Sequence, residues 1–593
     1  MSMSPSTVPG HPAATAVAPR APEAQATQAW WRGAVIYQVY PRSFADGNGD
    51  GTGDLAGVRA HLPYLHELGV DAIWFTPWYV SPLADGGYDV ADYRAIDPAF
   101  GTLEEAEALI AEAASLGIRT IVDVVPNHVS DQHVWFQEAL AAGPGSPERE
   151  RFWFHPGKGA DGAEIPTRWV SSFQGSTWTR TTDADGTPEE WYLHLFTPEQ
   201  PDVNWTHPDV RREHEDILRF WFDRGVAGIR IDSAALLVKD AELPEVPADP
   251  ADIAPGEHPF MDRDELHEVY RSWRRVADSY DEPRVLVGEI WLPDAKRFAD
   301  YLRPDEMHTA FNFLFMSCPW DGPAMRASID TTLEAHALVG APATWVLSNH
   351  DVTRPVTRYG RDDTSFAFEA KRFGTPTDLA LGTRRARAAA LLTAALPGCL
   401  YLYQGDELGL PEVEDLPRHA IQDPMHFRSE GVDPGRDGCR VPLPWTADAA
   451  TSYGFSLAGQ PGADSSEDGG APAASWLPQP AWWGSYAADV EAQDPASMLH
   501  LYRRAIALRR AEDGLREGGF TWLGRSEVPG LDTTSGSVLA FARGDVACVV
   551  NLGRDAVALP EDAEVLLSSG DDPAGALAPD TAVWLRLART DQP

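Results

Sequence analysis

The chain has 593 residues, 43% of them hydrophobic and 21 of them Trp, so it can bury more than one core. Because one compact core of this size is uncommon, we expect about two to four structural units. The 89 acidic and 48 basic side chains give a net charge of -41, which argues against nucleic acid or an anionic membrane surface as a partner, since like charges repel.

The first 28 residues are rich in Ala, Pro, Ser and Thr and lack the basic and apolar regions of a secretory signal. No apolar run in the chain approaches the ~20 residues that span a bilayer. We therefore expect a disordered tail over 1–28, no membrane partner and a cytoplasmic location. The four cysteines show no metal-ligand spacing, which favours buried free thiols in a reducing compartment.

A repeating pattern of helix, glycine and strand follows the tail. Helical periodicity over 102–116 and 208–224 ends at Gly117 and Gly225, and an apolar run begins almost at once in each case. A glycine just past a helix supplies its left-handed C-terminal cap. This rhythm predicts βα units and a parallel sheet.

Eight short runs rich in Val, Ile, Leu and aromatic residues predict strands that are buried on both faces. Eight such strands fit a closed (β/α)8 barrel, the TIM barrel, formed by 29–128 and 205–514. The run at 309–313 is the weakest. The predicted strands lie at 34–40, 72–75, 120–124, 228–231, 285–288, 309–313, 344–347 and 400–403.

The βα rhythm breaks over 129–204, a stretch rich in Trp, Gly, Pro and Ser. It is too long for a connecting loop, so we expect a small domain inserted after the third barrel strand, on the catalytic face. Beyond a helix at 498–510 apolar residues alternate, which predicts a C-terminal antiparallel β domain over 515–593. The composition of 457–475 is typical of a mobile surface loop.

Three carboxylates follow apolar runs of different predicted strands, namely Asp232, Glu289 and Asp351. A barrel brings such strand ends together around one pocket. One acidic residue alone is most simply a helix cap, but three indicate a catalytic centre, and two carboxylates flanking a bond permit glycoside hydrolysis. Arg230 lies two residues before Asp232, so both side chains point the same way and the guanidinium should hold Asp232 ionised.

Four segments at these strand ends resemble the signature regions of the α-amylase superfamily, glycoside hydrolase family 13, in order and spacing. They are Asp123–His128, Gly228–Asp232, Gly288–Trp291 and Asn349–Asp351. The resemblance extends along nearly the whole chain. It implies that Asp232 is the nucleophile, Glu289 the general acid and base, and Asp351 the stabiliser of the transition state.

The resemblance also implies which residues bind the substrate. Tyr88 would stack on the sugar that is released, Asp85 would bond its hydroxyls, and Asp123 matches a structural aspartate. The residues implied to contact the substrate or the catalytic carboxylates are Asp85, Tyr88, His128, Arg230, His350 and Arg440. No organic cofactor is implied.

Two further segments narrow the resemblance. Gln200–Trp205 is similar to a hallmark of oligo-1,6-glucosidases and α-glucosidases. Ala235 and Leu236 stand where endo-acting amylases carry a Lys–His pair that contacts a longer chain. The resemblance therefore implies a retaining, exo-acting α-glucosidase that removes terminal α-1,4-linked glucose from maltose and short oligosaccharides, as a monomer or weak homo-oligomer.

The linkage preference depends on the residue after the nucleophile, which tends to be small in α-1,4-specific relatives and Val in α-1,6-specific ones. Here it is Ser233, which we expect to point away from Asp232 and to act through the wall of the leaving side. Alternatives are an oligo-1,6-glucosidase, a sucrose-acting or transglycosylating glucosidase and a trehalose synthase. A non-catalytic amylase-like protein is a remote alternative, because such relatives have lost catalytic carboxylates.

The segment Asp46–Asp54 matches positions 1, 3, 5 and 6 of an EF-hand loop, but Gly57 stands at position 12, where an EF-hand needs Glu. An EF-hand is therefore excluded. Alternating oxygen donors still suit a hard cation, and the resembling glucosidases carry a structural Ca²⁺ there; the alternative is a loop of Asx turns. The expected ligands are the side chains of Asp46, Asn48, Asp50 and Asp54 and the carbonyl of Thr52.

Overall fold

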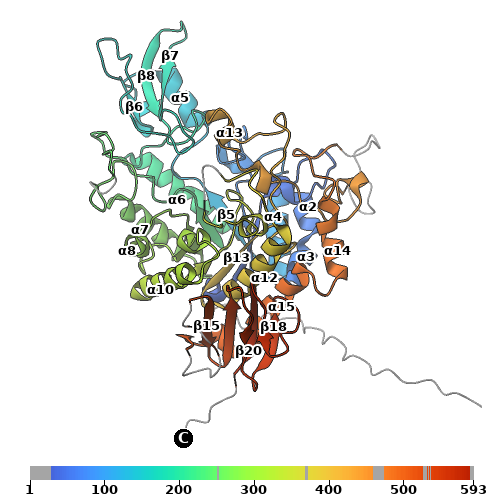
Figure 1. Ribbon diagram of the computed structural model, residues 1–593. Coiled ribbons are helices and arrows are strands. Elements are labelled where there is room, and N and C mark those ends of the chain that lie inside the picture. Colours follow the sequence, from blue (N-terminus) through green and yellow to red (C-terminus); the bar gives the residue numbers. More distant parts are fainter. Residues whose placement is uncertain are drawn as a thin grey trace, which may run out of the picture.

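Eight parallel strands form the central sheet of the molecule, in the order β11-β10-β9-β5-β2-β1-β13-β12, with helices around it (Figure 1). The sheet is a nearly closed barrel, so the predicted TIM-barrel fold is confirmed. The strands are β1 (Val35–Val39), β2 (Ala72–Phe75), β5 (Arg119–Val124), β9 (Gly228–Ile231), β10 (Val285–Gly288), β11 (Thr309–Ala310), β12 (Thr344–Trp345) and β13 (Cys399–Tyr403).

The computed structural model describes residues 29–249, 253–366, 371–457, 473–524, 531, 533 and 536–587. The predicted tail and most of the predicted loop at 457–475 lie outside these residues. Among the described residues, no helix combines the length and apolar character needed to cross a membrane. All four cysteines are described, buried and free of disulfides. The cytoplasmic location stays a prediction.

The strands are parallel and in register because each βα unit returns the chain to the same edge of the sheet. Val122 of β5 pairs with Ile229 of β9, and Val287 of β10 pairs with Arg230 of β9. The residues of β9 and β10 are buried on both faces. Thr102 and Glu105 form the predicted capping box at the start of the helix before β5. The long helices are α4 (Leu103–Ser115), α6 (Pro208–Asp223), α7 (Leu266–Ala277), α10 (Gly322–Val339), α12 (Leu379–Ala395) and α15 (Met498–Ala511).

Shorter helices and one hairpin fill the connections of the barrel. The hairpin pairs β3 (Tyr79–Val80) with β4 (Asp92–Ile96). The shorter helices are α1 (Pro41–Phe44), α2 (Leu55–Ala60), α3 (Leu62–Leu68), α5 (Val134–Ala142), α8 (Ala295–Asp300), α9 (Phe313–Met316), α11 (Pro355–Tyr359), α13 (Pro424–Arg428), α14 (Ala488–Gln493) and α16 (Asp513–Glu517).

The insert after β5 forms its own three-stranded antiparallel sheet, ordered β6-β8-β7. Its strands are β6 (Phe154–His155), β7 (Trp178–Thr182) and β8 (Pro188–Leu193). A small core of Trp169, Trp178, Leu193 and Leu195 supports it. In Figure 1 this sheet projects from the top of the molecule.

The C-terminal domain is a five-stranded sheet at the opposite end of the view in Figure 1. It packs against the barrel through β20 and α12, where the Trp584 indole donates to the carbonyl of Leu391 at 3.0 Å. Its strands are β14 (Phe520–Trp522), β15 (Val538–Arg543), β16 (Val546–Asn551), β18 (Glu564–Ser568) and β20 (Thr581–Arg586), beside a small pair of β17 (Val557–Ala558) and β19 (Ala576–Leu577).

Candidate active site

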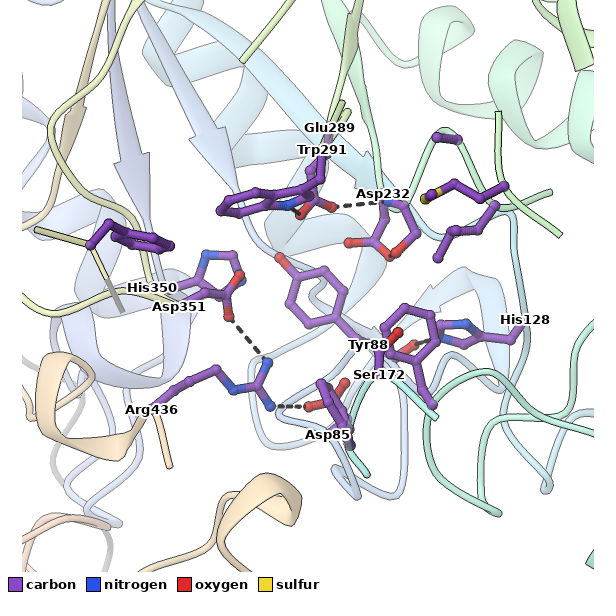
Figure 2. A pocket seen from close by; sticks show the side chains of 17 residues that line it. Asp85, Tyr88, His128, Ser172, Asp232, Glu289, Trp291, His350, Asp351 and Arg436 are labelled. Carbon is purple, nitrogen blue, oxygen red and sulfur yellow. Dashed lines mark hydrogen bonds and ion pairs between the residues drawn. The ribbon is translucent and has the colours of Figure 1, made fainter. Parts of the chain in front are cut away.

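The three predicted catalytic carboxylates converge on one pocket of about 490 Å³ (Figure 2). Asp232 directly follows β9, and Glu289 directly follows β10. The amide of Glu289 continues the ladder by donating to the carbonyl of Ile231 at 2.9 Å. The predicted residues that line the pocket are Asp85, Tyr88, His128, Asp232, Glu289, His350 and Asp351.

Arg230 lies beneath the pocket and binds three carboxylates at once. Its Nη1 is 2.6 Å from Asp232 Oδ1 and 2.9 Å from Asp123 Oδ1, and its Nη2 is 2.8 Å from Glu289 Oε2. Only 1% of the Arg230 side chain is exposed. Since Asp232 and Glu289 bind neighbouring nitrogens of one rigid guanidinium, their carboxylates are held close together.

The electrostatics of this cluster differ from the expectation that Arg230 holds Asp232 ionised. The contact is present, but burial and the adjacent Glu289 carboxylate raise the pKa of Asp232 against the effect of Arg230. Burial likewise raises the pKa of Asp123 to about 7, again against Arg230. One buried cation therefore faces three buried carboxylates.

Ser233 does not point away from the nucleophile as expected. Its hydroxyl donates to Asp232 Oδ2 at 2.9 Å, and its amide donates to Glu289 Oε2 at 2.9 Å. The reason is that β9 ends at Ile231, so strand alternation no longer applies, and Ser233 takes a left-handed backbone with φ 45°. Ser233 therefore contacts both predicted catalytic carboxylates directly.

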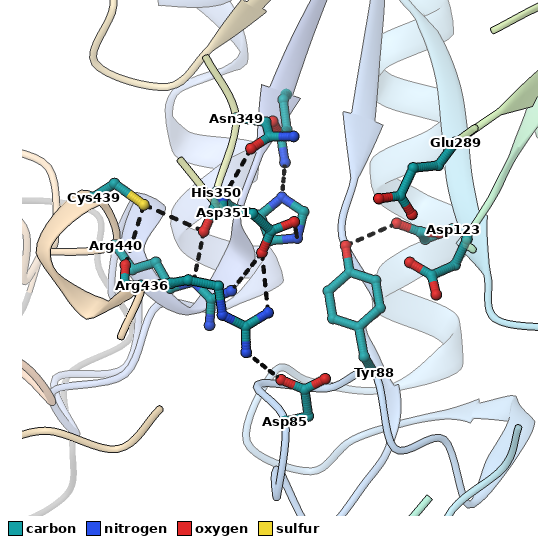
Figure 3. Close-up of polar contacts among 12 residues, drawn as sticks. Asp85, Tyr88, Asp123, Glu289, Asn349, His350, Asp351, Arg436, Cys439 and Arg440 are labelled. Carbon is teal, nitrogen blue, oxygen red and sulfur yellow. Dashed lines mark hydrogen bonds and ion pairs between the residues drawn. The ribbon is translucent and has the colours of Figure 1, made fainter. Parts of the chain in front are cut away.

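One end of the pocket is lined by an ion network around Arg436 (Figures 2 and 3). Its Nη2 is 2.6 Å from Asp85 Oδ1, its Nη1 is 3.1 Å from Asp351 Oδ1, and its Nε is 2.7 Å from Asp423 Oδ2. We call Asp85, His350, Asp351 and Arg436 the ionic end. Burial alone would raise the pKa of Asp351, but His350 and three arginines, Arg436, Arg440 and Arg230, hold it well below its usual range.

Arg436 takes the position that the sequence assigned to Arg440. Arg440 is absent from the lining of the pocket and lies behind Asp351, where its Nη2 is 2.9 Å from Asp351 Oδ1. Its Nε donates to the carbonyl of His350 at 2.8 Å (Figure 3). Both arginines belong to one short segment, so the sequence could find the segment but not which guanidinium reaches the cavity.

His350 is a neutral imidazole held by Gln38, a residue that the sequence did not single out. The Gln38 amide lies 2.7 Å from His350 Nδ1. If it donates there, the ring carries its hydrogen on Nε2, which lies 3.4 Å from Asp351 Oδ2. Burial lowers the pKa of His350 to about 3. The Tyr88 ring stacks on His350 with centroids 5.3 Å apart.

Gln200, the first residue of the predicted hallmark, anchors the site from the insert. Its Nε2 donates to Asp85 Oδ2 at 3.1 Å and lies 3.0 Å from His128 Nε2. His128 Nε2 is also 3.1 Å from the carbonyl of Tyr88, and burial lowers the pKa of His128 to about 3. The hallmark segment therefore acts by holding the ionic end in place.

A buried ion pair joins the same segment to the loop after the nucleophile. Lys239 Nζ is 2.8 Å from Asp202 Oδ2 and 2.6 Å from Asn127 Oδ1. The side chains of Lys239 and Asp202 are fully buried. Because removing one partner of a buried pair costs about 3–5 kcal/mol, this pair fixes the insert relative to the barrel.

The opposite side of the pocket is apolar and begins at Trp291, which the sequence placed in a signature segment without a role. Its indole N–H donates to Glu289 Oε1 at 3.0 Å, and its ring stacks on Phe313 with centroids 3.8 Å apart. Figure 2 shows Trp291 and Glu289 across the pocket from Asp85 and Arg436. We call the following lining residues the apolar side: Ala235, Leu236, Met261, Trp291 and Phe366.

The predicted calcium loop is closed by its own hydrogen bonds. Asp46 Oδ1 accepts from the amide of Gly49 at 2.6 Å, and Asp54 caps α2 by accepting from Gly57 at 2.7 Å. The side-chain oxygens of Asn48 and Asp50 each accept from the amide two residues on, at 2.8 Å. Within the described chain no three His, Cys, Asp or Glu side chains are grouped as a metal would need. These contacts match a loop of Asx turns, and calcium stays a prediction.

Known family models match both the barrel region and the C-terminal domain of the chain. Residues 38–518 match the model of the alpha amylase catalytic domain, and residues 521–584 match a domain of unknown function, DUF3459. The chain is 36% identical over 551 residues to a probable alpha-glucosidase of Rhizobium meliloti (strain 1021), covering 89% of this chain and 90% of that protein.

Two other similarities show how much chemistry this architecture accommodates. The chain is 34% identical over 530 residues to a trehalose-6-phosphate hydrolase of Escherichia coli (strain K12), covering 83% of this chain and 86% of that protein. The crystal structure of the alpha-glucosyl transfer enzyme XgtA has a TM-score of 0.76 and 33% identity, covering 94% of this chain and 99% of that chain.

Proposed function

The chain belongs to the α-amylase family of glycoside hydrolases, and we propose that it is a retaining, exo-acting α-glucosidase. Its substrates would be maltose and short oligosaccharides with a terminal α-1,4-linked glucose. The observation that carries the proposal is the ion network that lines one end of the pocket. A chain of sugars cannot extend past Arg436 while it bridges Asp85 and Asp351, so one terminal glucose fits and the rest must leave on the other side.

The two carboxylates on Arg230 support a double displacement. Retaining glycosidases need their two carboxyl groups close together, because one attacks the anomeric carbon directly. Asp232 would attack C1 while Glu289 gives a proton to the leaving oxygen, and Asp351, ionised by its basic neighbours, would stabilise the positive charge that develops on the ring. Water activated by Glu289 would then release α-glucose.

A neutral substrate is favoured over a phosphorylated one. A trehalose-6-phosphate hydrolase needs a cation for the phosphate, and phosphate recognition usually relies on Arg or Lys with available donors. Among the described residues that line the pocket, Arg436 is the one Arg or Lys, and it is bound to Asp85, Asp351 and Asp423. We therefore propose an uncharged leaving sugar.

The experiment is product analysis with maltose, isomaltose, sucrose, trehalose and trehalose 6-phosphate, together with Asp232→Asn. We expect α-glucose as the first product from maltose, and loss of turnover by roughly 10⁴-fold in Asp232→Asn with an unchanged melting temperature. Formation of trehalose or trehalulose as the main product would identify an isomerase. Cleavage of isomaltose in preference to maltose would identify an oligo-1,6-glucosidase.

We further propose, from the family resemblance alone, that the loop Asp46–Asp54 binds Ca²⁺. Binding would require the side chains of Asp46, Asp50 and Asp54 to turn from their present amide partners towards a common centre. Added Ca²⁺ should then raise the melting temperature by mass action, and chelation should lower it with little change in initial rate, because the loop has no part in the chemistry. An unchanged melting temperature in both arms would contradict the ion.

A further inference from the structure

Arg428 ends the short helix α13 and reaches from there to the insert, which lies beside α13 in Figure 1. Its Nε donates to the carbonyl oxygens of Phe173 at 3.2 Å and of Gln174 at 3.1 Å. Its Nη2 donates to the carbonyl of Gln174 at 2.6 Å and to that of Ser176 at 3.3 Å. One guanidinium therefore binds three backbone carbonyls of the loop 171–176, which its fixed fork of donors allows.

The loop 171–176 is a tight turn that lets the guanidinium approach. The amide of Gln174 donates to the carbonyl of Ser171 at 2.9 Å, and the amide of Ser171 donates to the carbonyl of Gly175 at 3.0 Å. Gln174 and Gly175 both have left-handed backbones, with φ of 68° and 81°. A Cβ atom on Gly175 would lie 3.2 Å from Arg428 Nη2, so glycine suits both the turn and the contact.

The same loop supplies part of the wall of the pocket. Ser172 and Phe173 line the cavity, and the Phe173 side chain is buried. The guanidinium carbon of Arg436 lies 4.8 Å from the centroid of the Phe173 ring, and the centroid of the Phe196 ring lies 5.3 Å from the same point. Since a cation is attracted to the face of an aromatic ring, the positions of Phe173 and Arg436 depend on each other.

Helix α13 connects Arg428 to Arg436. Asp423 caps the helix, because its Oδ1 accepts from the amide of Met425 at 2.9 Å, while its Oδ2 accepts from Arg436 Nε at 2.7 Å. The helix that carries Arg428 at its end is therefore anchored at its start to the arginine of the ionic end. Arg428 is not itself among the described residues that line the pocket. Any effect of Arg428 on a bound sugar must pass through the loop 171–176.

We propose that Arg428 is a positioning residue for the sugar at the ionic end. By holding the loop 171–176 against α13, it keeps the Phe173 ring on Arg436. This inference rests on the proposed function, since it takes the terminal glucose to bind at the ionic end. Loss of Arg428 should weaken the binding of glucose in the ground state and in the transition state alike, which raises KM and leaves kcat nearly unchanged.

The test compares wild type, Arg428→Ala and the matched control Arg180→Ala. Arg180 also binds two backbone carbonyls, those of Glu189 at 3.0 Å and Asp161 at 2.8 Å, but it lies on β7 of the insert and outside the lining of the pocket. Kinetics on maltose are measured together with the Kd of glucose by calorimetry, which needs no turnover. We expect Arg428→Ala to raise KM and Kd about tenfold each and to change kcat less than about threefold. The control should change none of the three by more than about twofold.

Two further measurements separate positioning from a general loss of stability. Guanidinium chloride at about 10 mM should lower the KM of Arg428→Ala at least threefold by occupying the vacated site, whereas it would weaken a protein that was merely less stable. Phe173→Leu removes the ring, so adding Arg428→Ala to it should cause no further rise in KM, because residues that act in series are not additive. Losses that multiply in the double variant would contradict the route through Phe173.

Failure of this inference and failure of the proposed function give different results. Unchanged KM and Kd in a folded Arg428→Ala, or an equal rise in Arg180→Ala, would overturn the positioning role while wild type still hydrolyses maltose. A wild type without maltose turnover would overturn the proposed function, and the Kd of glucose would still decide the role of Arg428. If Arg428→Ala does not fold, Arg428→Lys takes its place. A single ammonium cannot reach three carbonyls, so its KM should rise about threefold, and an unchanged KM would overturn the inference.

Discussion

The ionic end of the pocket is a network of buried charges, whereas the apolar side is a wall of aromatic and aliphatic side chains. At the ionic end Arg436 alone contacts three carboxylates, and Gln200 and Arg440 hold two of these from behind. Buried charges are tolerated only when paired, so this geometry is rigidly specified. Apolar side chains of similar size can replace one another with small losses of stability.

The difference explains how one architecture can serve several reactions. A glucose bound at the ionic end, as proposed, would meet directional hydrogen-bonding groups, so the glucose unit itself would be closely defined. The apolar side defines little beyond shape and polarity, and its members come from four separate segments of the chain. Exchange of a few side chains there would change the leaving group or acceptor while the chemistry at Asp232 and Glu289 is kept.

The largest expected effect comes from breaking the ionic end at Arg436. Arg436→Lys should lower kcat/KM on maltose by roughly 100-fold, because a single ammonium cannot bridge Asp85, Asp351 and Asp423 in the fixed geometry of a guanidinium. Steady-state kinetics and the melting temperature of the variant measure this.

Arg440→Lys is the matched comparison for that experiment. Arg440 contacts Asp351 and the carbonyl of His350 from outside the pocket. We therefore expect Arg440→Lys to lower kcat/KM less than about tenfold and to lower the melting temperature measurably. A larger kinetic loss in Arg440→Lys than in Arg436→Lys would restore the assignment made from the sequence and contradict the geometry.

These two arginines also show what the sequence can predict and what it cannot. Strands buried on both faces have few alternatives, and β2, β9 and β10 begin and end at the predicted residues. The weak strand predicted at 309–313 ends at Ala310, because the Asn312 side chain caps α9 by accepting from the amide of Phe315. Local periodicity contains no information about such a competing cap.

The sequence predicts the position of a site residue where a single functional side chain follows a barrel strand. Asp232, Glu289 and Asp351 meet because the barrel topology allows no other arrangement of their strands. The sequence fails where loop geometry decides, as in the left-handed turn at Ser233 and in the choice between Arg436 and Arg440. Trp291 carries no signal of its own, since only the fold reveals that its indole reaches Glu289.

The second prediction concerns pH, because His350 at the ionic end is buried and its pKa is lowered. Burial lowers its pKa from 6.5 to about 3, so below pH 6.5 the unfolded chain binds a proton that the folded chain does not. The stability that His350 contributes is therefore fully present above pH 6.5 and is lost as the pH falls towards 3. Between pH 7 and pH 5 the loss should be about 2 kcal/mol.

Denaturant unfolding of wild type and His350→Gln at pH 7 and pH 5 measures this loss. Buried carboxyls such as Asp123, whose pKa is raised to about 7, act in the opposite direction, but they are common to both proteins and cancel in the difference. We expect the variant to lose less stability than wild type on acidification. Equal losses would show that folding does not lower the pKa of His350.

A third prediction tests where the two sides meet, at Glu289. Trp291→Phe removes the N–H that binds Glu289 Oε1 but keeps a ring stacked on Phe313. Loss of this hydrogen bond to the general acid should lower kcat on maltose about tenfold with little change in KM. Turnover of α-glucosyl fluoride should hardly change, because its leaving group needs no proton.

Trp482→Phe is the control for that variant. Trp482 is 40% exposed, close to the 38% of Trp291, and it lies outside the lining of the pocket. It should be neutral on both substrates. An equal loss of activity on maltose and fluoride in Trp291→Phe would mean that Trp291 supports the pocket as a whole and does not position the acid.

The smallest expected effect is a shift in linkage preference at Ser233, which lies between the two sides. Ser233→Ala removes the hydroxyl from Asp232 and should lower kcat a few-fold on maltose and isomaltose alike. Ser233→Val also loses this hydroxyl and adds a branched side chain beside the leaving group, which should move the ratio of kcat/KM towards isomaltose by about 1 kcal/mol, or roughly fivefold. The difference between the two variants isolates the branch from the hydroxyl. Because a branched residue resists the left-handed backbone at this position, the melting temperature of Ser233→Val must be measured alongside. An unchanged ratio in a stably folded Ser233→Val would remove Ser233 as a determinant of linkage and leave the choice to the apolar side.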